Sequence, residues 1–219
     1  SFSQDSRTIE SRVSEFLENI PVIHIQLSDT IMKELVFLGE EGIRQICNQI
    51  VPAGTRDDSR PRFVLENYTR FISGQLYKKE KVRWERICIN YASGSNDAGV
   101  KNFFMTQLQR IGGKDAIALV SKEFENGNPD IREICFRVLL NWHDSSAAYA
   151  LFDICSSGNK TFEGPAFCGY TDHVKNSFLP DEQKLLLFRK IMPFALTPER
   201  RIRIISEIGK LKTYQSLFY

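Results

Sequence analysis

Residues 114–142 read KDAIALVSKEFENGNPDIREICFRVLLNW, and this stretch decides how the chain folds. Apolar residues recur every three or four positions on both sides of a short polar segment, which places them on one face of a helix. Asn128 can accept hydrogen bonds from the exposed amides at a helix start, and Pro129 and Asp130 suit the first helical turn. The stretch therefore predicts two amphipathic helices joined by a tight turn.

Much of the remaining sequence repeats this plan. Earlier helices are expected near residues 6–20, 28–38, 41–51, 60–73, 77–93 and 97–111. First helices of later pairs are expected to begin near Lys114, Ser146, Asp181 and Thr213, about 31 to 35 residues apart, within the repeat range of helical solenoids. No stretch alternates apolar and polar residues as a strand would.

The fold predicted from this periodicity is all-α, an α–α superhelix of about five to six stacked helix pairs. We expect one domain over residues 1–219, with the more regular repeats at 113–219 and the start of an incomplete further repeat at 213–219. Ser28 and Thr197 are expected to cap helix starts. Five glycines are expected to end helices in the left-handed conformation: Gly39, Gly74, Gly94, Gly112 and Gly127.

Composition excludes several functional classes. Apolar residues make up 42% of the 219 residues and charged residues 26%, which is typical of a folded soluble chain. The net charge of +2 argues against a dedicated nucleic-acid binder and predicts only weak, salt-sensitive DNA binding. No run approaches the roughly 20 apolar residues that a membrane span needs.

The two ends of the sequence suggest a processed or excised piece of a larger protein. The chain begins SFSQDSRTIE, without Met or the apolar core of a signal peptide. It ends TYQSLFY, an apolar tip that we expect to bind a partner through Tyr214, Phe218 and Tyr219. Ile202, Ile205 and Ile208 are expected to face one way beside this tip.

Residues 114–142 resemble a HEAT repeat. In that family an Asp just after the turn and an Arg two positions later hold neighbouring repeats in register, and Asp130-Ile131-Arg132 matches this pattern. Residues 35–74 and 179–217 resemble a bacterial subgroup of HEAT-like proteins, in which such arrays often occur within larger exported proteins, sometimes beside a carbohydrate-active domain. The resemblance implies a periplasmic or exported location, with the cytoplasm as the alternative, and it brings no catalytic residues.

Few side chains suggest chemistry. The polar loop at residues 51–61 carries Arg56 and Asp57, candidates for contact with a partner, but its acidic residues equally suit a helix cap formed by Asp58 or Ser59. Arg200 and Arg201 are further partner-binding candidates. The three histidines, His24, His143 and His173, are widely separated and predict no metal site. The chain has five cysteines and no CxxC pair, which predicts buried free thiols: Cys47, Cys88, Cys135, Cys155 and Cys168.

Basic clusters leave a second function open. They comprise Lys78, Lys79, Lys81, Arg83 and Arg86 on one helix and Arg200, Arg201 and Arg203 on another. HEAT-like folds include alkylpurine DNA glycosylases, which use a basic concave face with Trp and acidic residues, and Trp84 and Trp142 are candidates for that role. Neighbouring glutamates favour an ordinary solvated helix face instead. Gly112-Gly113 suits either a phosphate contact or, more simply, a corner between helices.

The sequence thus favours a non-catalytic helical-repeat scaffold that presents a concave surface to a protein partner or to another domain of its parent chain. No cofactor, metal or catalytic residue is expected. The alternative is an enzyme of the HEAT-like alkylpurine DNA glycosylase type.

Overall fold

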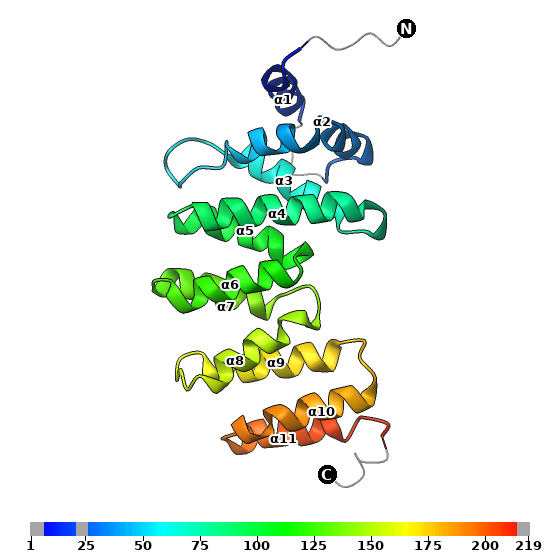
Figure 1. Ribbon diagram of the computed structural model, residues 1–219, viewed down its shortest axis with the longest axis vertical. Coiled ribbons are helices and arrows are strands. Elements are labelled where there is room, and N and C mark those ends of the chain that lie inside the picture. Colours follow the sequence, from blue (N-terminus) through cyan, green and yellow to red (C-terminus); the bar gives the residue numbers. More distant parts are fainter. Residues whose placement is uncertain (1–6, 21–25, 214–219) are drawn as a thin grey trace. The chain divides into compact units, whose positions relative to one another are not determined.

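The structure is a computed structural model that describes residues 7–20 and 26–213. Within these residues it contains eleven α-helices, three short 3-10 helices and no strand (Figure 1). The α-helices pack as pairs that are adjacent in sequence, so the all-α class and the paired arrangement of an α–α superhelix are confirmed.

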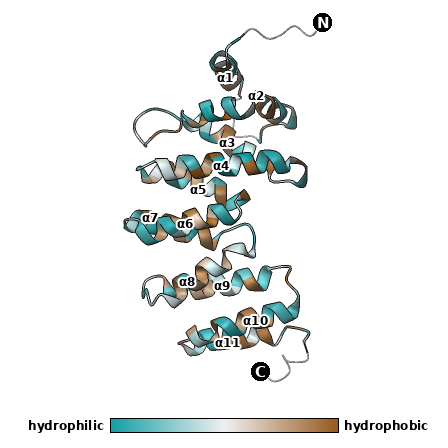
Figure 2. Ribbon diagram, in the orientation of Figure 1, coloured by the Kyte–Doolittle hydropathy of each residue, from teal (hydrophilic) through white to brown (hydrophobic). Residues whose placement is uncertain are grey.

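The bounds of the helices follow the predicted periodicity closely. They are α1 (Ile9–Glu18), α2 (Asp29–Cys47), α3 (Ser59–Ile72), α4 (Lys78–Gly94), α5 (Ala98–Ile111), α6 (Lys114–Asn126), α7 (Pro129–Leu140), α8 (Ala148–Ser156), α9 (Glu163–Asn176), α10 (Asp181–Ile191) and α11 (Pro198–Ile208), with the 3-10 helices η1 (Gln75–Tyr77), η2 (Ser145–Ala147) and η3 (Met192–Phe194). Figure 2 shows polar and apolar residues alternating along individual helices, as amphipathic packing requires. The further repeat expected from Thr213 falls almost wholly on residues 214–219, outside the described part.

The chain divides into two compact units. Unit 1 comprises Ser1–Leu119 and Asn128–Ile131, and unit 2 comprises Val120–Gly127 and Arg132–Tyr219. Helices α6 and α7 each contribute residues to both units. The single repeat domain that the sequence predicts stays a prediction.

In unit 1, α1 packs on α2, α2 on α3, and α3 and α4 on α5. The core contains a network of hydrogen bonds around the side chain of Trp84, which is fully buried. The Trp84 indole N–H donates to the Thr69 hydroxyl oxygen at 2.8 Å, and the Thr69 hydroxyl lies 2.8 Å from Gln107 Oε1 and 3.0 Å from the Leu65 carbonyl. The network joins α3, α4 and α5, because buried polar groups must find partners within the protein.

In unit 2, α8 packs on α9, and α10 and α11 pack on α9 and on each other. Gly169 permits a close approach to α9, because a Cβ at this position would lie 2.3 Å from Leu140 Cδ2 and 3.2 Å from Leu151 Cδ1. Phe124, Phe136 and Phe162 form an aromatic cluster with ring centroids 4.8 to 6.3 Å apart. Such pairs stabilise by about 0.5–1.5 kcal/mol beyond the area they bury.

The predicted helix starts are confirmed in detail. Ser28 Oγ, Asn128 Oδ1 and Thr197 Oγ1 accept hydrogen bonds from the amides three positions later, at 3.4, 3.0 and 3.3 Å. Each bond satisfies one of the amides that a helix start leaves without an intrahelical acceptor. Arg132, from the HEAT-like Asp-x-Arg pattern, donates to the carbonyls of Glu125 and Gly127 at the end of α6.

The glycines lie at or beside helix ends as expected, but the left-handed conformation is wrong at four of the five positions. Gly39 has φ 72° and breaks α2, separating the two helices expected at 28–38 and 41–51. Gly74 and Gly112 have φ near −68° and leave their helices in an extended conformation, and Gly94 and Gly127 also lack a positive φ. The Gly112 and Gly127 amides still bond helical carbonyls, those of Leu108 and Glu123, so these ends need no left-handed residue.

One prediction about the last helix is also wrong. Ile202 and Ile205 on α11 are 67% and 44% exposed, but Ile208 is fully buried together with Ile204. A step of four residues returns to the same helix face, so Ile208 follows Ile204 into the core instead of sharing the outer face. The outer face of α11 thus carries two exposed isoleucines.

Candidate functional site

Arg56 and Asp57 lie in the polar loop between α2 and α3 and bond to different backbone groups. Asp57 Oδ1 accepts a hydrogen bond from the Ser59 amide at 2.9 Å, and Arg56 donates to the Asn48 carbonyl at 3.4 Å. Asp58 occupies the N-cap position of α3, but the capping hydrogen bond predicted from Asp58 or Ser59 is wrong, because the Asp58 side chain bonds no helix amide and Ser59 is the first helical residue.

Asp58 Oδ2 accepts from the Val51 amide at 2.9 Å, and Asp58 Oδ1 accepts from Arg62 Nε at 2.8 Å. Arg62 also donates to the Val51 carbonyl at 3.1 Å, so the side chains of Asp58 and Arg62 bind the end of the loop to the Val51 backbone at its start. The pKa of Asp58 is lowered despite the opposing effect of burial, because Arg62 and the Val51 amide stabilise the carboxylate. Hydrogen bonds between residues of the loop and the start of α3 therefore hold the loop in place, and Asp57 is exposed on its surface.

Asp57 contributes to a groove in unit 1, which we call the α1–α3 groove. The groove has a volume of about 740 Å³ and runs between α1, the end of α2 and the start of α3. This volume is within the usual range for ligand-binding clefts. Its lining combines apolar, amide and charged side chains: Glu10, Val13, Ser14, Leu17, Glu18, Ile20, Gln45, Gln49, Asp57, Ser59, Arg60, Pro61 and Phe63.

Unit 2 contains a second groove, which the sequence did not predict and which we call the α8–α10 groove. It has a volume of about 460 Å³ and is lined by Ser145, Ser146, Ala148, Tyr149, Tyr170, Val174, Leu179, Gln183, Leu186, Leu187 and Lys190. Tyr170 and Val174 on α9 are fully buried and form its floor. Tyr149 and Leu186 form its rim and remain 59% and 63% exposed. The groove is mainly apolar.

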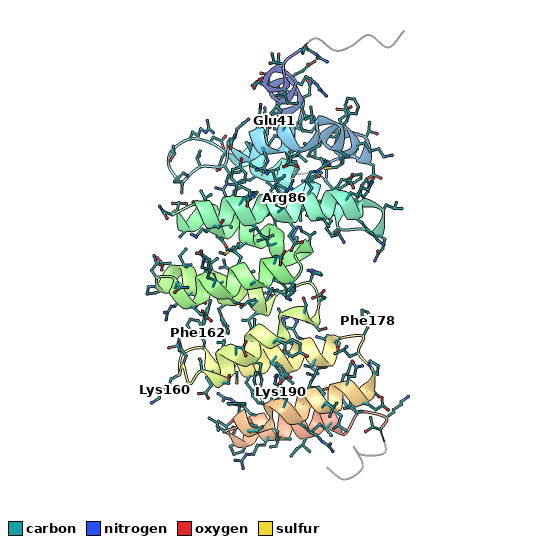
Figure 3. The ribbon with its side chains drawn as sticks, viewed as in Figure 1. Glu41, Arg86, Lys160, Phe162, Phe178 and Lys190 are labelled. Carbon is teal, nitrogen blue, oxygen red and sulfur yellow. The ribbon has the colours of Figure 1, made fainter. Side chains whose placement is uncertain are left out.

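Lys190 is the one charged residue among the described residues that line the α8–α10 groove. Figure 3 shows it on α10, in unit 2, and its ammonium lies 4.1 Å from the Phe152 ring centroid and 5.0 Å from that of Tyr149. These cation–π contacts hold the charge beside the apolar rim. A single cation next to exposed apolar side chains suits a partner that presents a carboxylate beside an apolar face.

The basic residues on α11 make contacts within unit 2. Arg200 Nη1 lies 2.9 Å from Glu163 Oε1, and Arg201 Nε donates to the Ala195 carbonyl at 3.0 Å. These arginines therefore hold η3 and the start of α9 to α11. Arg200 and Arg201 belong to unit 2, whereas Arg56 and Asp57 belong to unit 1.

The basic cluster on α4 is also engaged locally. Arg86, which extends from α4 in Figure 3, lies 2.7 Å from Glu40, and Arg83 lies 3.7 Å from the same carboxylate. Arg44 bonds Glu40 as well, and this hydrogen bond is the main cause of the lowered pKa of Glu40. Glu40 thus contacts three guanidinium groups in a local ion-pair network, in which its single negative charge offsets only part of their positive charge.

Neither tryptophan is placed to stack on a nucleic-acid base. Trp84 is fully buried in unit 1, and Trp142 is 4% exposed in unit 2. The candidate phosphate site at Gly112-Gly113 is occupied by a carboxylate, since the Gly113 amide donates to Glu85 Oε1 at 2.7 Å. The burial of Trp84 and Trp142 and the hydrogen bond from Gly113 support structural roles for these residues.

Two of the histidines lie in the same part of unit 2. His143 and His173 both line a small pocket of about 220 Å³ at the end of α7, and His173 Nε2 lies 2.9 Å from the Leu139 carbonyl. No group of three His, Cys, Asp or Glu residues suited to a metal ion occurs in the described ranges. His24 lies outside the described residues, as do three of the predicted partner-binding residues: Tyr214, Phe218 and Tyr219.

The cysteines are free thiols, and all except the half-buried Cys168 are buried. Burial raises the pKa of Cys47 and Cys88 well above the ordinary value and raises the pKa of Cys155 to about 11. Buried thiols with a raised pKa are poor nucleophiles, because the thiolate is the reactive form. The predicted role of these cysteines as small core residues is therefore supported by their burial.

The difference in burial between Cys168 and the other cysteines leads to a testable prediction. We expect a thiol reagent at about pH 8 to modify Cys168 first and the other cysteines only after denaturant is added. Because folding raises the pKa of Cys47, Cys88 and Cys155, the unfolded chain releases their protons first as the pH rises above about 9, and the free energy of unfolding should fall there. Counting modified thiols by mass spectrometry checks the order, and urea titrations across this pH range check the sign. Equal labelling of all five thiols in the native protein would contradict their burial.

None of the described helices combines the length and apolar character needed to cross a membrane. Comparison with known proteins adds no functional assignment: no family model, curated protein or solved structure matches the chain.

Proposed function

We propose that this protein is a non-catalytic, HEAT-like helical-repeat scaffold that binds a protein partner or another domain of its parent chain. The observation that carries the proposal is the α8–α10 groove, in which Tyr149 and Leu186 expose apolar surface on both sides of a buried floor. Exposed apolar surface that is gathered in a groove is typical of interaction sites. The helix pairing and the Asp130-Ile131-Arg132 pattern support the HEAT-like assignment.

The occupant that best fits the α8–α10 groove is an amphipathic helix with an acidic residue. Its apolar face would cover Tyr149 and Leu186, in the manner of helix-in-groove recognition. Its carboxylate would pair with Lys190, the charge held beside the rim by the rings of Tyr149 and Phe152. A bacterial, exported parent protein remains part of the proposal through the resemblance alone.

Site-specific photocrosslinking tests the proposal in cells that make the protein. A photoreactive phenylalanine at position 186 should give one discrete covalent adduct with a protein partner or a neighbouring domain, because Leu186 is 63% exposed at the groove rim. Adding Lys190→Glu should reduce the adduct several-fold, since it would set like charges against each other. The same photoreactive residue at Lys160, an exposed position in the loop before α9, is the control (Figure 3).

The adduct should be absent from the control position. Equal crosslinking from positions 160 and 186, or an adduct at 186 that is unaffected by Lys190→Glu, would show that the α8–α10 groove is not a specific interface. The alternative glycosylase function has a separate readout: sub-micromolar binding of a labelled DNA duplex at physiological salt, or release of an alkylated base, would replace the scaffold with an enzyme.

A further inference from the structure

The α1–α3 groove differs from the α8–α10 groove in the charge of its rim. Val13 and Leu17 on α1, only 2% and 7% exposed, contribute to its apolar floor. Above this floor the rim carries three carboxylates, those of Glu10, Glu18 and Asp57. Among the described residues that line the groove, Arg60 supplies the one basic side chain, so negative charge predominates.

The charged residues of helix α1 line two cavities: Glu10 and Glu18 line the α1–α3 groove, and Arg12 and Glu15 line another. Glu10 and Glu18 are eight residues apart, which places them about 80° from each other around the helix, and both line the α1–α3 groove. Arg7 and Arg12 line a different cavity, where the Arg12 guanidinium lies 5.5 Å from the centre of the Phe37 ring. Arg12 on α1 and Arg7, which precedes this helix, thus lie away from the acidic rim.

Two of the rim carboxylates, those of Glu10 and Asp57, accept hydrogen bonds from uncharged groups. The Glu10 carboxylate accepts from Gln45 Nε2 at 3.0 Å, and its pKa is lowered by its own backbone amide, by the Thr8 hydroxyl and by Gln45. The pKa of Asp57 is lowered by the hydroxyl and the amide of Ser59. Hydrogen bonds to the charged form favour that form, so Glu10 and Asp57 are ionised at neutral pH.

We propose that the α1–α3 groove binds a short peptide segment in which apolar side chains are flanked by Lys or Arg. The apolar side chains would cover the floor around Val13 and Leu17, and the cations would face Glu10, Glu18 and Asp57. The two grooves would then select segments of opposite charge, which gives the scaffold two distinguishable contacts. The inference rests on the proposed function, because it names the chemistry of a second contact of the same scaffold.

A pair of labelled peptides tests the proposal by fluorescence anisotropy with the whole chain. One peptide has about twelve residues of Leu, Ala and Lys, enough for a short helix or an extended segment, and the other has Glu in place of each Lys. The lysine peptide should bind wild type and lose at least about tenfold in affinity in the triple variant Glu10→Gln, Glu18→Gln, Asp57→Asn, a change of about 1.4 kcal/mol. Its affinity should also fall as salt is added.

Three controls decide where and how the peptide binds. Glu66→Gln, which removes an exposed carboxylate on α3 outside the groove, should leave the affinity unchanged. Ser14→Tyr should block binding by filling the groove while every rim carboxylate is retained. A lysine peptide with Ser in place of each Leu should bind far more weakly, because it cannot cover the apolar floor. Circular dichroism verifies that each variant is folded.

The proposal is wrong if the lysine peptide does not bind wild type, if folded triple and Ser14→Tyr variants bind it as wild type does, or if the Leu-to-Ser peptide binds equally well. The variant Lys190→Glu should not change binding of the lysine peptide. Loss of the crosslink at position 186 together with intact peptide binding would remove the α8–α10 interface only. The reverse result would remove only the peptide site of the α1–α3 groove.

Discussion

Leu139→Asp is expected to unfold the part of unit 2 around α7. Leu139 is fully buried, and a carboxylate at this position would be transferred from water into an apolar environment without a partner. Truncating a buried Leu alone costs about 2–5 kcal/mol, and the buried charge adds to that cost. A domain is typically stable by about 5–15 kcal/mol, so a loss of stability of this size should unfold this part of the chain. Circular dichroism should then show much less helical signal for the variant than for wild type in a thermal denaturation.

Glu133→Asp is the matched control, because it introduces the same side chain on the exposed face of α7. It should change the thermal midpoint little, as surface substitutions usually do. If Leu139→Asp kept the wild-type midpoint, Leu139 would have to face solvent and the helix phase of α7 would be incorrect.

Trp84→Ala is expected to have a comparable effect on unit 1. Trp84 is among the largest fully buried side chains, and its ring lies edge-on to Tyr68 with centroids 5.6 Å apart. Removing the indole leaves a cavity between α3 and α4 and takes a hydrogen-bond donor from the Thr69 hydroxyl. Together these losses should cost about 3–5 kcal/mol in urea denaturation followed by circular dichroism. Trp142 is the remaining tryptophan, so its fluorescence reports separately on unit 2.

Trp84→Phe separates packing from hydrogen bonding. It keeps an aromatic ring but removes the N–H that donates to Thr69, so a smaller loss of about 1–3 kcal/mol is expected. A loss below about 1 kcal/mol for Trp84→Ala would mean that the network of Thr69, Trp84 and Gln107 does not hold α3, α4 and α5 together.

The helices and their starting residues follow from local sequence. Asn128 and Thr197 cap as predicted because a cap needs only a side-chain oxygen within three residues of an exposed amide. The buried positions of Leu139 and Cys135 follow from helical periodicity, which places every third or fourth residue on one face. These properties depend on neighbours along the chain, so the sequence alone is sufficient to predict them.

Side-chain partners could not be predicted in the same way. Asp58 or Ser59 was expected to cap α3, but the Asp58 carboxylate binds Arg62 in the first turn of α3 and the Val51 amide, which the path of the loop brings beside it. The glycines show the same limit: whether Gly39 or Gly112 needs a positive φ depends on the direction in which the chain leaves the helix. That direction is set by packing with the next element.

The sequence by itself determined the all-α class, the helix pairs, most helix boundaries and the buried stripes, because hydrophobic periodicity and capping act over a few residues. Only the tertiary structure decided which polar and apolar side chains meet. Tyr149 and Leu186 lie on separate helices and become one groove rim when α8 and α10 pack on α9, and Glu10 and Asp57 share a rim because α1 lies near the start of α3. The physical reason is that a groove is formed by surfaces distant in sequence, whose proximity no local pattern records.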